Sequence, residues 1–174
     1  MVGRSGAEWS DLLRRLKAIP SWVGWSGRRI GKRLHGVFVG MFEHVLDEKG
    51  RVVLPTSFRG RLADGGFLGT YDSALALWTP EDFEGFVNRM TERVRDGEVR
   101  PSALRALTAQ ATDVRPDSQG RILVHPRLRA HAALERDVVL VGSRDHIEIW
   151  DDQRWAEASA LDEVSLAEAV GSGI

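Results

Sequence analysis

The pentapeptide Asp-x-x-Gly-Arg occurs twice in this chain of 174 residues, at Asp47–Arg51 and at Asp117–Arg121. Aspartate at the first position of a type I turn accepts hydrogen bonds from the backbone amides that follow, and glycine at the fourth position takes the left-handed conformation that the turn requires. The chain then returns as a strand, so that the arginine lies at the tip of a hairpin, close to its own aspartate, which can hold the guanidinium by a bidentate contact. A guanidinium held in this way loses less entropy on binding a phosphate or a guanine edge. The two pentapeptides therefore indicate a nucleic-acid-binding surface that is presented twice.

The two turns differ in charge, because Lys49 of the first is replaced by the neutral Gln119 in the second. We therefore expect the first turn to make the stronger electrostatic contact. One copy alone would indicate only a hairpin with a surface ion pair, but turn stability does not require arginine after glycine in both copies. Arg59 and Arg129 also recur, and capping or pairing near a helix explains them at least as well as a DNA contact. The predicted DNA-binding residues are Asp47, Lys49, Gly50, Arg51, Asp117, Gly120 and Arg121.

No pattern in the chain indicates catalysis or metal binding. The chain has no cysteine, and its five histidines are scattered without metal-ligand spacing. Adjacent acids such as Glu81 and Asp82 are better explained by the dipole of a helix that starts there. Phosphate-binding and nucleophile motifs are absent, and no run approaches the roughly 18 apolar residues of a membrane span. We therefore expect a protein that is not an enzyme, with no cofactor, no metal, no small-molecule substrate and no membrane.

The repeat extends beyond the turns and determines the architecture. At an offset of 70 positions Arg51–Leu54 aligns with Arg121–Val124, and at an offset of 72 Leu75–Trp78 aligns with Ile147–Trp150. Each half reads as turn, strand, short helical segment, strand, turn, strand and helix. Two copies are too few for a solenoid. We therefore expect two halves that pair about a pseudo-twofold axis.

Hydrophobic patterning places the elements that must position the turns. Apolar-rich runs predict strands at 38–46 and 51–54, flanking the first turn, and hairpins at 67–70 with 74–78 and at 138–141 with 146–150. Thr79 followed by proline and two acids is typical of a helix start. A second short helix is predicted at 102–111. Asp151 or Asp152 is predicted to cap a last helix that ends at about Val170.

Residues 1–36 differ from the rest of the chain in charge. They hold eight lysines and arginines against two acidic residues, a net charge of +6, whereas residues 37–174 hold sixteen against twenty-three, a net charge of −7. A short helix is predicted at Ser10–Ile19. One interpretation is a basic arm that contacts nucleic acid or a membrane surface. The other is a disordered tail or a mispredicted translation start. The acidic body must bind nucleic acid through a localised basic face.

The segment Phe38–Pro55, together with Asp117–Arg121 and Ile147–Asp151, resembles the MraZ family of bacterial regulators over about residues 37–160. The resemblance implies an α+β fold made of duplicated AbrB-like swapped-hairpin β-barrel halves with pseudo-twofold symmetry and peripheral helices. It implies a homo-oligomer, a closed ring, that binds short direct repeats in double-stranded DNA near the promoter of the division and cell-wall gene cluster. The Asp-x-x-x-Arg turns face the DNA in that family. Such a regulator, a repressor, would be cytoplasmic and nucleoid-associated.

The resemblance also divides the chain. It gives a basic extension at 1–36, a SpoVT-AbrB-like repeat at 37–84, a helical connector at 85–110, a second repeat at 111–155, and a C-terminal helix and tail at 156–174. Because family members usually begin with Met-Phe-x-Gly, Val37 is a candidate for the true start. An alternative function on the same fold is an antitoxin-like protein-interaction module. Its signature would be a long disordered acidic tail, whereas the acidic C-terminal segment is predicted to be helical.

Overall fold

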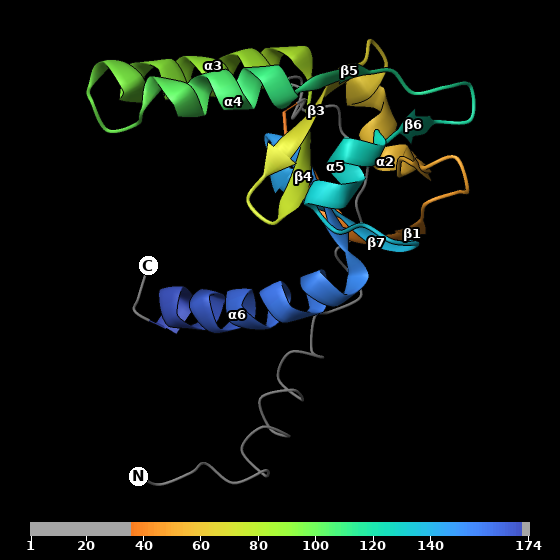
Figure 1. Ribbon diagram of the computed structural model, residues 1–174. Coiled ribbons are helices and arrows are strands. Elements are labelled where there is room, and N and C mark those ends of the chain that lie inside the picture. Colours follow the sequence, from red (N-terminus) through yellow and green to blue (C-terminus); the bar gives the residue numbers. More distant parts are fainter. Residues whose placement is uncertain (1–35, 172–174) are drawn as a thin grey trace, which may run out of the picture. The chain divides into compact units, whose positions relative to one another are not determined.

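The computed structural model describes residues 36–171, so the predicted helix at Ser10–Ile19 and the basic arm lie outside the described residues. The described part is a mixed α+β fold (Figure 1). Its elements, in chain order, are β1 (Phe38–Val45), β2 (Arg51–Val53), α2 (Thr56–Arg59), the 3-10 helix η1 (Gly60–Leu62), β3 (Gly66–Tyr71), β4 (Ala74–Trp78), α3 (Pro80–Arg95), α4 (Pro101–Gln110), β5 (Thr112–Val114), β6 (Arg121–Leu123), α5 (Pro126–His131), β7 (Asp137–Arg144), β8 (His146–Asp151) and α6 (Asp152–Gly171).

Six of the strands form one antiparallel sheet in the order β1-β7-β8-β4-β3-β5, and β2 pairs with β6 in a separate two-stranded ribbon. The predicted hairpins β3–β4 and β7–β8 are confirmed. The larger sheet is open, with β1 and β5 at its two edges, so the closed barrel expected from the resemblance is not what the strand pairing gives. The expectation that the first turn closes a hairpin between its flanking strands is also wrong, because β1 pairs with β7 and β2 pairs with β6.

The strand pairing exchanges partners between the two halves of the chain. β1 of the first half pairs with β7 of the second, and β5 of the second half pairs with β3 of the first. β4 pairs with its counterpart β8, and β2 pairs with its counterpart β6. Exchanging the two halves converts the β1–β7 pair into the β5–β3 pair, and it converts the β4–β8 and β2–β6 pairs into themselves. The strand pairing thus has the pseudo-twofold pattern that the sequence repeat predicts.

The hydrophobic core lies under the β2–β6 ribbon. Val52 and Ile122 are paired across the ribbon, and both are fully buried. Phe58 of α2 lies edge-on to the ring of Phe38, with 5.4 Å between ring centroids, and Leu128 of α5 is buried in the same cluster. Because burial of such side chains stabilises a fold by about 1.5–3 kcal/mol each, the ribbon is fixed to the core through its inner face.

Two helical segments flank the large sheet. In α3, Thr79 caps the start by accepting a hydrogen bond of 3.2 Å from the amide of Asp82, as predicted. Phe86 of α3 stacks on Trp78 of β4 with 5.2 Å between ring centroids. α4 packs beside α3, and the two helices run alongside each other in Figure 1. α3 and α4 therefore form a helical pair between β4 and β5.

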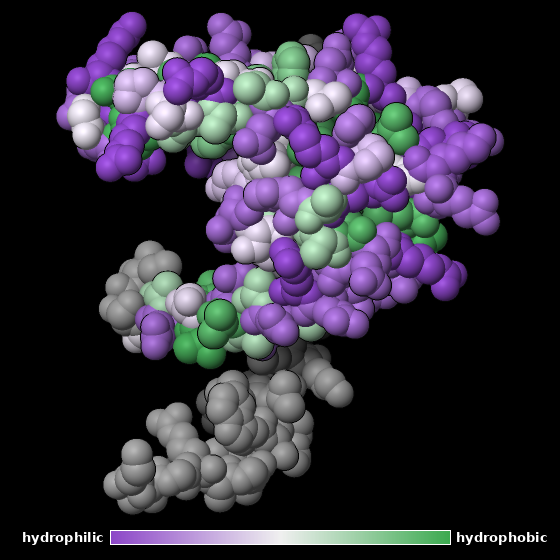
Figure 2. Space-filling model, in the orientation of Figure 1, coloured by the Kyte–Doolittle hydropathy of each residue, from purple (hydrophilic) through white to green (hydrophobic). Residues whose placement is uncertain are grey.

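The last helix, α6, is anchored at its beginning. Asp151 Oδ1 accepts hydrogen bonds from the amides of Gln153 and Arg154, which confirms Asp151 as the cap. The indole Nε1 of Trp155 donates to Sδ of Met41 on β1 at 3.2 Å. Beyond this anchor the helix has no buried residue, and Figure 2 shows hydrophobic surface along it. No helix of the described part is long and apolar enough to cross a membrane.

Candidate nucleic-acid interface

The first Asp-x-x-Gly-Arg turn is closed by hydrogen bonds from both the side chain and the backbone of its aspartate. Asp47 Oδ1 accepts from the amides of Lys49 and Arg51, each at 2.9 Å. The amide of Gly50 donates to the carbonyl of Asp47 at 2.8 Å, and Gly50 has φ of 74°. These contacts confirm the predicted roles of aspartate and glycine in the turn.

The second turn has the same geometry. Asp117 Oδ1 accepts from the amides of Gln119 and Arg121, each at 2.9 Å, and Gly120 has φ of 76°. The amide of Gly120 donates to the carbonyl of Asp117 at 2.8 Å. The two pentapeptides are therefore one structural device that occurs twice.

Each turn holds its arginine by a contact that differs from the expected bidentate pair. Because Oδ1 of each aspartate is occupied by backbone amides, the guanidinium contacts Oδ2. In the first turn both Nε and Nη2 of Arg51 lie 2.7 Å from Oδ2 of Asp47, and in the second Nε of Arg121 lies 2.8 Å from Oδ2 of Asp117. The carboxylate thus fixes the backbone turn and the guanidinium at the same time.

The pKa values of the two aspartates follow from these contacts. The side-chain hydrogen bond from Arg51, supported by backbone amides, lowers the pKa of Asp47 from 3.8 to about 2. The backbone hydrogen bond from Arg121, assisted by its side chain, lowers the pKa of Asp117. Both carboxylates are therefore ionised at neutral pH. They keep both arginines oriented under the conditions in which nucleic acid would bind.

The ribbon places both arginines on the same outward face. Residues directly opposite each other in an antiparallel pair point to the same side. Arg51 is opposite Leu123, and Val53 is opposite Arg121. Since Val52 and Ile122 point into the core, these four side chains lie on the outer face. Diagonal neighbours of this kind have Cα atoms about 7–8 Å apart, so the ribbon brings the two arginines together at the side of the molecule from which both turns project (Figure 1).

In addition, one arginine from each half lies against the turn of the other half. Arg129 of α5 lies against Gly50, so that a Cβ atom added to Gly50 would be 2.9 Å from Cζ of Arg129. Arg59 of α2 lies against Gly120, where an added Cβ would be 2.6 Å from Cζ of Arg59, and Nε of Arg59 donates to the carbonyl of Leu54 at 2.7 Å. Capping or pairing near a helix, which the sequence allowed for Arg59 and Arg129, does not describe their contacts with the two turns. Each turn is therefore packed by an arginine of the other half.

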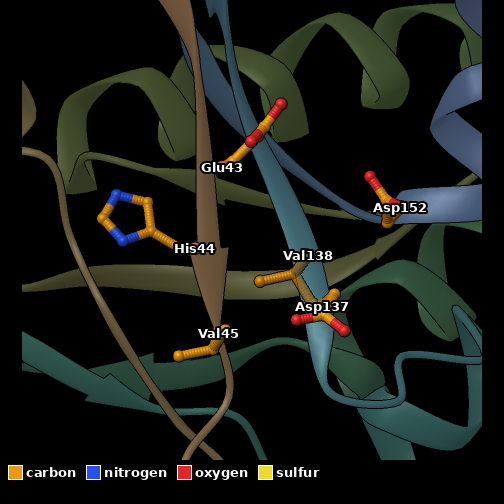
Figure 3. Close-up of a pocket in the computed structure, with 6 residues that line it drawn as sticks. All are labelled: Glu43, His44, Val45, Asp137, Val138 and Asp152. Carbon is orange, nitrogen blue, oxygen red and sulfur yellow. The ribbon is translucent and has the colours of Figure 1, made fainter.

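A pocket beside β1 and β7 is an alternative candidate for a binding site. The pocket in Figure 3 has a volume of about 490 Å³ and is lined by Glu43, His44, Val45, Asp137, Val138 and Asp152. Glu43 and His44 project from opposite sides of β1 (Figure 3). Three carboxylates repel a phosphate, and no group of His, Cys, Asp and Glu that could hold a metal ion is found among residues 36–171. The paired turns are therefore the stronger candidate site.

Comparison with known proteins gives a consistent result over the same residues. The model of the family described as "MraZ protein, putative antitoxin-like" matches residues 37–100 and 107–171. The chain is 37% identical over 135 residues to the transcriptional regulator MraZ of Mycolicibacterium smegmatis, and 39% identical over 135 residues to that of Nocardia farcinica. Each alignment covers 76% of this chain and 94% of the relative. The protein of the same name from Cutibacterium acnes is 36% identical over 137 residues.

Proposed function

The chain belongs to the MraZ family, and we propose that it is a transcriptional regulator that binds double-stranded DNA through the outer face of the β2–β6 ribbon. The observation that supports this proposal best is the pair of aspartate-held arginines on one face. A two-stranded ribbon fits the major groove, where arginine recognises the N7 and O6 atoms of guanine. The proposed DNA-binding residues are Asp47, Lys49, Gly50, Arg51, Asp117, Gly120 and Arg121.

The exchange of strands between the halves is the basis for a finer interpretation of the fold. We interpret β1, β2, β3 and β4 as one AbrB-like unit and β5, β6, β7 and β8 as the other, with their hairpins swapped. We propose that these two units lie within residues 37–84 and 111–155. In it the binding surface belongs to neither unit alone, because each turn is packed by an arginine of the other unit.

We propose further that the protein acts as a homo-oligomer, a closed ring, on short direct repeats near its own promoter, as a cytoplasmic, nucleoid-associated repressor. Two exposed apolar surfaces favour self-association. Val39 and Met41 of the edge strand β1 are 66% and 54% exposed, and Leu161 and Val164 of α6 are 71% and 58% exposed. Because the body of the chain carries a net negative charge, one subunit binds DNA weakly, and several linked ribbons would gain about 10²–10⁴-fold in avidity.

A gel-shift titration tests the ring on DNA. Duplexes with one, two and three copies of the repeat upstream of this gene are compared at one salt concentration. We expect the apparent affinity to rise steeply with the number of repeats. Equal affinity for one and three repeats would contradict binding by linked subunits, and equal affinity for an unrelated duplex of the same length would contradict sequence-specific binding.

Alanine variants of the two arginines test the ribbon. Arg51→Ala and Arg121→Ala should each weaken binding by about 1–3 kcal/mol for every base that the arginine recognises. Arg105→Ala is the matched control, because it removes one exposed positive charge from α4. DNA binding that survives the replacement of both Arg51 and Arg121 would remove the ribbon from the interface.

The antitoxin-like alternative takes its support from the description of the family. An antitoxin would use a disordered acidic tail to wrap a partner protein. The acidic C-terminal segment is helical from Asp152 to Gly171 instead, which favours the DNA-binding function. A pull-down with the full chain distinguishes the two, since recovery of a stoichiometric protein partner and no DNA would support the alternative.

A further inference from the structure

The outer face of the ribbon carries an exposed leucine between its arginines. Leu123 is 54% exposed and lies directly opposite Arg51. Elsewhere in residues 36–171, the exposed large hydrophobic side chains lie on β1, immediately before it, or on α6. A leucine beside the arginines of the ribbon therefore differs from these two apolar surfaces in its surroundings.

The position of Leu123 is not explained by the core. The buried side chains of the ribbon are Val52 and Ile122, on the opposite face. The counterpart of Leu123 in the first half is Val53, which is smaller and only partly exposed. The apolar surface of the outer face is therefore concentrated beside Arg51. Arg51 belongs to the first turn, which also carries Lys49.

The spacing fits neighbouring positions in a major groove. Directly opposite residues of an antiparallel pair have Cβ atoms about 4.5–5.5 Å apart, while successive base pairs are about 3.4 Å apart. If Arg51 binds a guanine edge or a phosphate, Leu123 reaches a base pair one or two steps away. The only apolar group that a base presents in the major groove is the 5-methyl group of thymine.

We propose that Leu123 is a specificity-determining residue that contacts the 5-methyl group of a thymine next to the base or phosphate bound by Arg51. This inference rests on the proposed DNA-binding function and adds a second kind of recognition to it. Arginine alone selects guanine or binds phosphate without regard to sequence, whereas an apolar contact distinguishes thymine from cytosine. The first turn, with Leu123 beside it, thus carries more sequence information than the second.

Deoxyuridine scanning tests the proposal directly. The probe is a duplex of the DNA immediately upstream of this gene, in which each thymine in turn is replaced by deoxyuridine, which lacks only the methyl group. At one or two positions per repeat the unaltered protein should lose about four-fold in affinity, the effect of one buried methyl group. Leu123→Ala and Leu123→Asn should bind the thymine and deoxyuridine duplexes equally, while Leu123→Met should keep the discrimination.

The outcomes separate this proposal from the function on which it rests. Specific binding by the unaltered protein with no sensitive thymine, or a Leu123→Ala variant that keeps the sensitivity, overturns the role of Leu123 and leaves DNA binding intact. Equal weakening on every duplex, or a changed oligomeric mass of Leu123→Asn in light scattering, assigns Leu123 to packing or to contact between copies and also overturns it. Binding no tighter than to an unrelated duplex overturns the proposed function itself.

Discussion

Replacing Gly120 with alanine should destabilise the fold more than the same change at Gly50 or at Gly97. All three glycines have a left-handed backbone, with φ of 76°, 74° and 77°. A Cβ atom in this conformation costs about 1–2 kcal/mol, and alanine recovers about 0.4–1 kcal/mol by restricting the unfolded chain. These contributions are common to the three sites. The differences between the variants therefore reveal what each Cβ atom meets.

The surroundings of the three glycines set the expected order. A Cβ atom at Gly97 meets nothing within 4 Å, so Gly97→Ala should cost about 1 kcal/mol or less. At Gly50 it meets the guanidinium of Arg129, whose Nε has no hydrogen-bond partner among the described residues, so that no hydrogen bond of this atom is lost when the side chain shifts. At Gly120 it meets Arg59, whose Nε is bonded to a backbone carbonyl at 2.7 Å. Breaking that charged hydrogen bond adds about 1.5–3 kcal/mol.

Urea unfolding at one fixed protein concentration measures the three variants, since association contributes to the apparent stability. The excess cost of Gly120→Ala over Gly97→Ala should disappear when Arg59 is also replaced by alanine, which a double-mutant cycle detects. Gly120→Ala should also weaken DNA binding, while Gly97→Ala should not. The crossing contact would be refuted by equal destabilisation at Gly120 and Gly97, or by an excess that persists without Arg59.

Three further predictions concern pH and helix capping. Because the folded-state pKa of Asp47 is lowered to about 2, its contribution to stability is present above pH 4 and lost as pH falls toward 2; thermal unfolding of Asp47→Asn should therefore vary less over this interval, and identical profiles would contradict the ion pair. Burial lowers the pKa of His146, but hydrogen bonds with Glu148 and Asp145 outweigh it and raise the pKa. The resulting stabilisation is complete below pH 6.5 and lost at higher pH, so His146→Gln should cost more at pH 6 than at pH 9 in the same assay, and an equal cost would exclude a charged histidine. Thr79→Ala removes the cap of α3 and should destabilise by about 1 kcal/mol, measured by urea unfolding against Thr91→Ala, which leaves the cap intact; equal costs would refute the capping role.

The sequence was informative wherever the structure depends on local chemistry. The turns at Asp47 and Asp117, the cap at Thr79 and the two hairpins follow from short-range rules, and each is found as predicted. The sequence did not identify which strands pair with each other. Alternation in the segment that contains Phe38 indicates a strand with one buried face, but it holds no information on whether the neighbour is β2 or β7. The expected hairpin between β1 and β2 was wrong for this reason.

The crossing arginines could not be found by the same reasoning. Arg59 and Arg129 recur at the same spacing from the arginine of each turn, and this repetition was the one available signal. Their contacts depend on the exchange between halves, which places α2 against the turn of the second repeat. Within its own half, the side chain of Arg59 donates a hydrogen bond to the carbonyl of Leu54. A side chain whose partner lies in the other repeat becomes interpretable only when the strand pairing is known.

The exchange also connects stability with binding. An isolated two-stranded ribbon is marginal in water, and β2 and β6 contribute only three residues each. Their rigidity must therefore come from Val52 and Ile122, which are fully buried, and from the arginines behind the turns. A held guanidinium loses less entropy on binding only while its support is rigid. If the ribbon binds DNA as proposed, loosening the core under it should lower DNA affinity even where Arg51 and Arg121 are untouched. The two halves are therefore structurally interdependent, because each supplies one arginine to the outer face and one that lies against the turn of the other half.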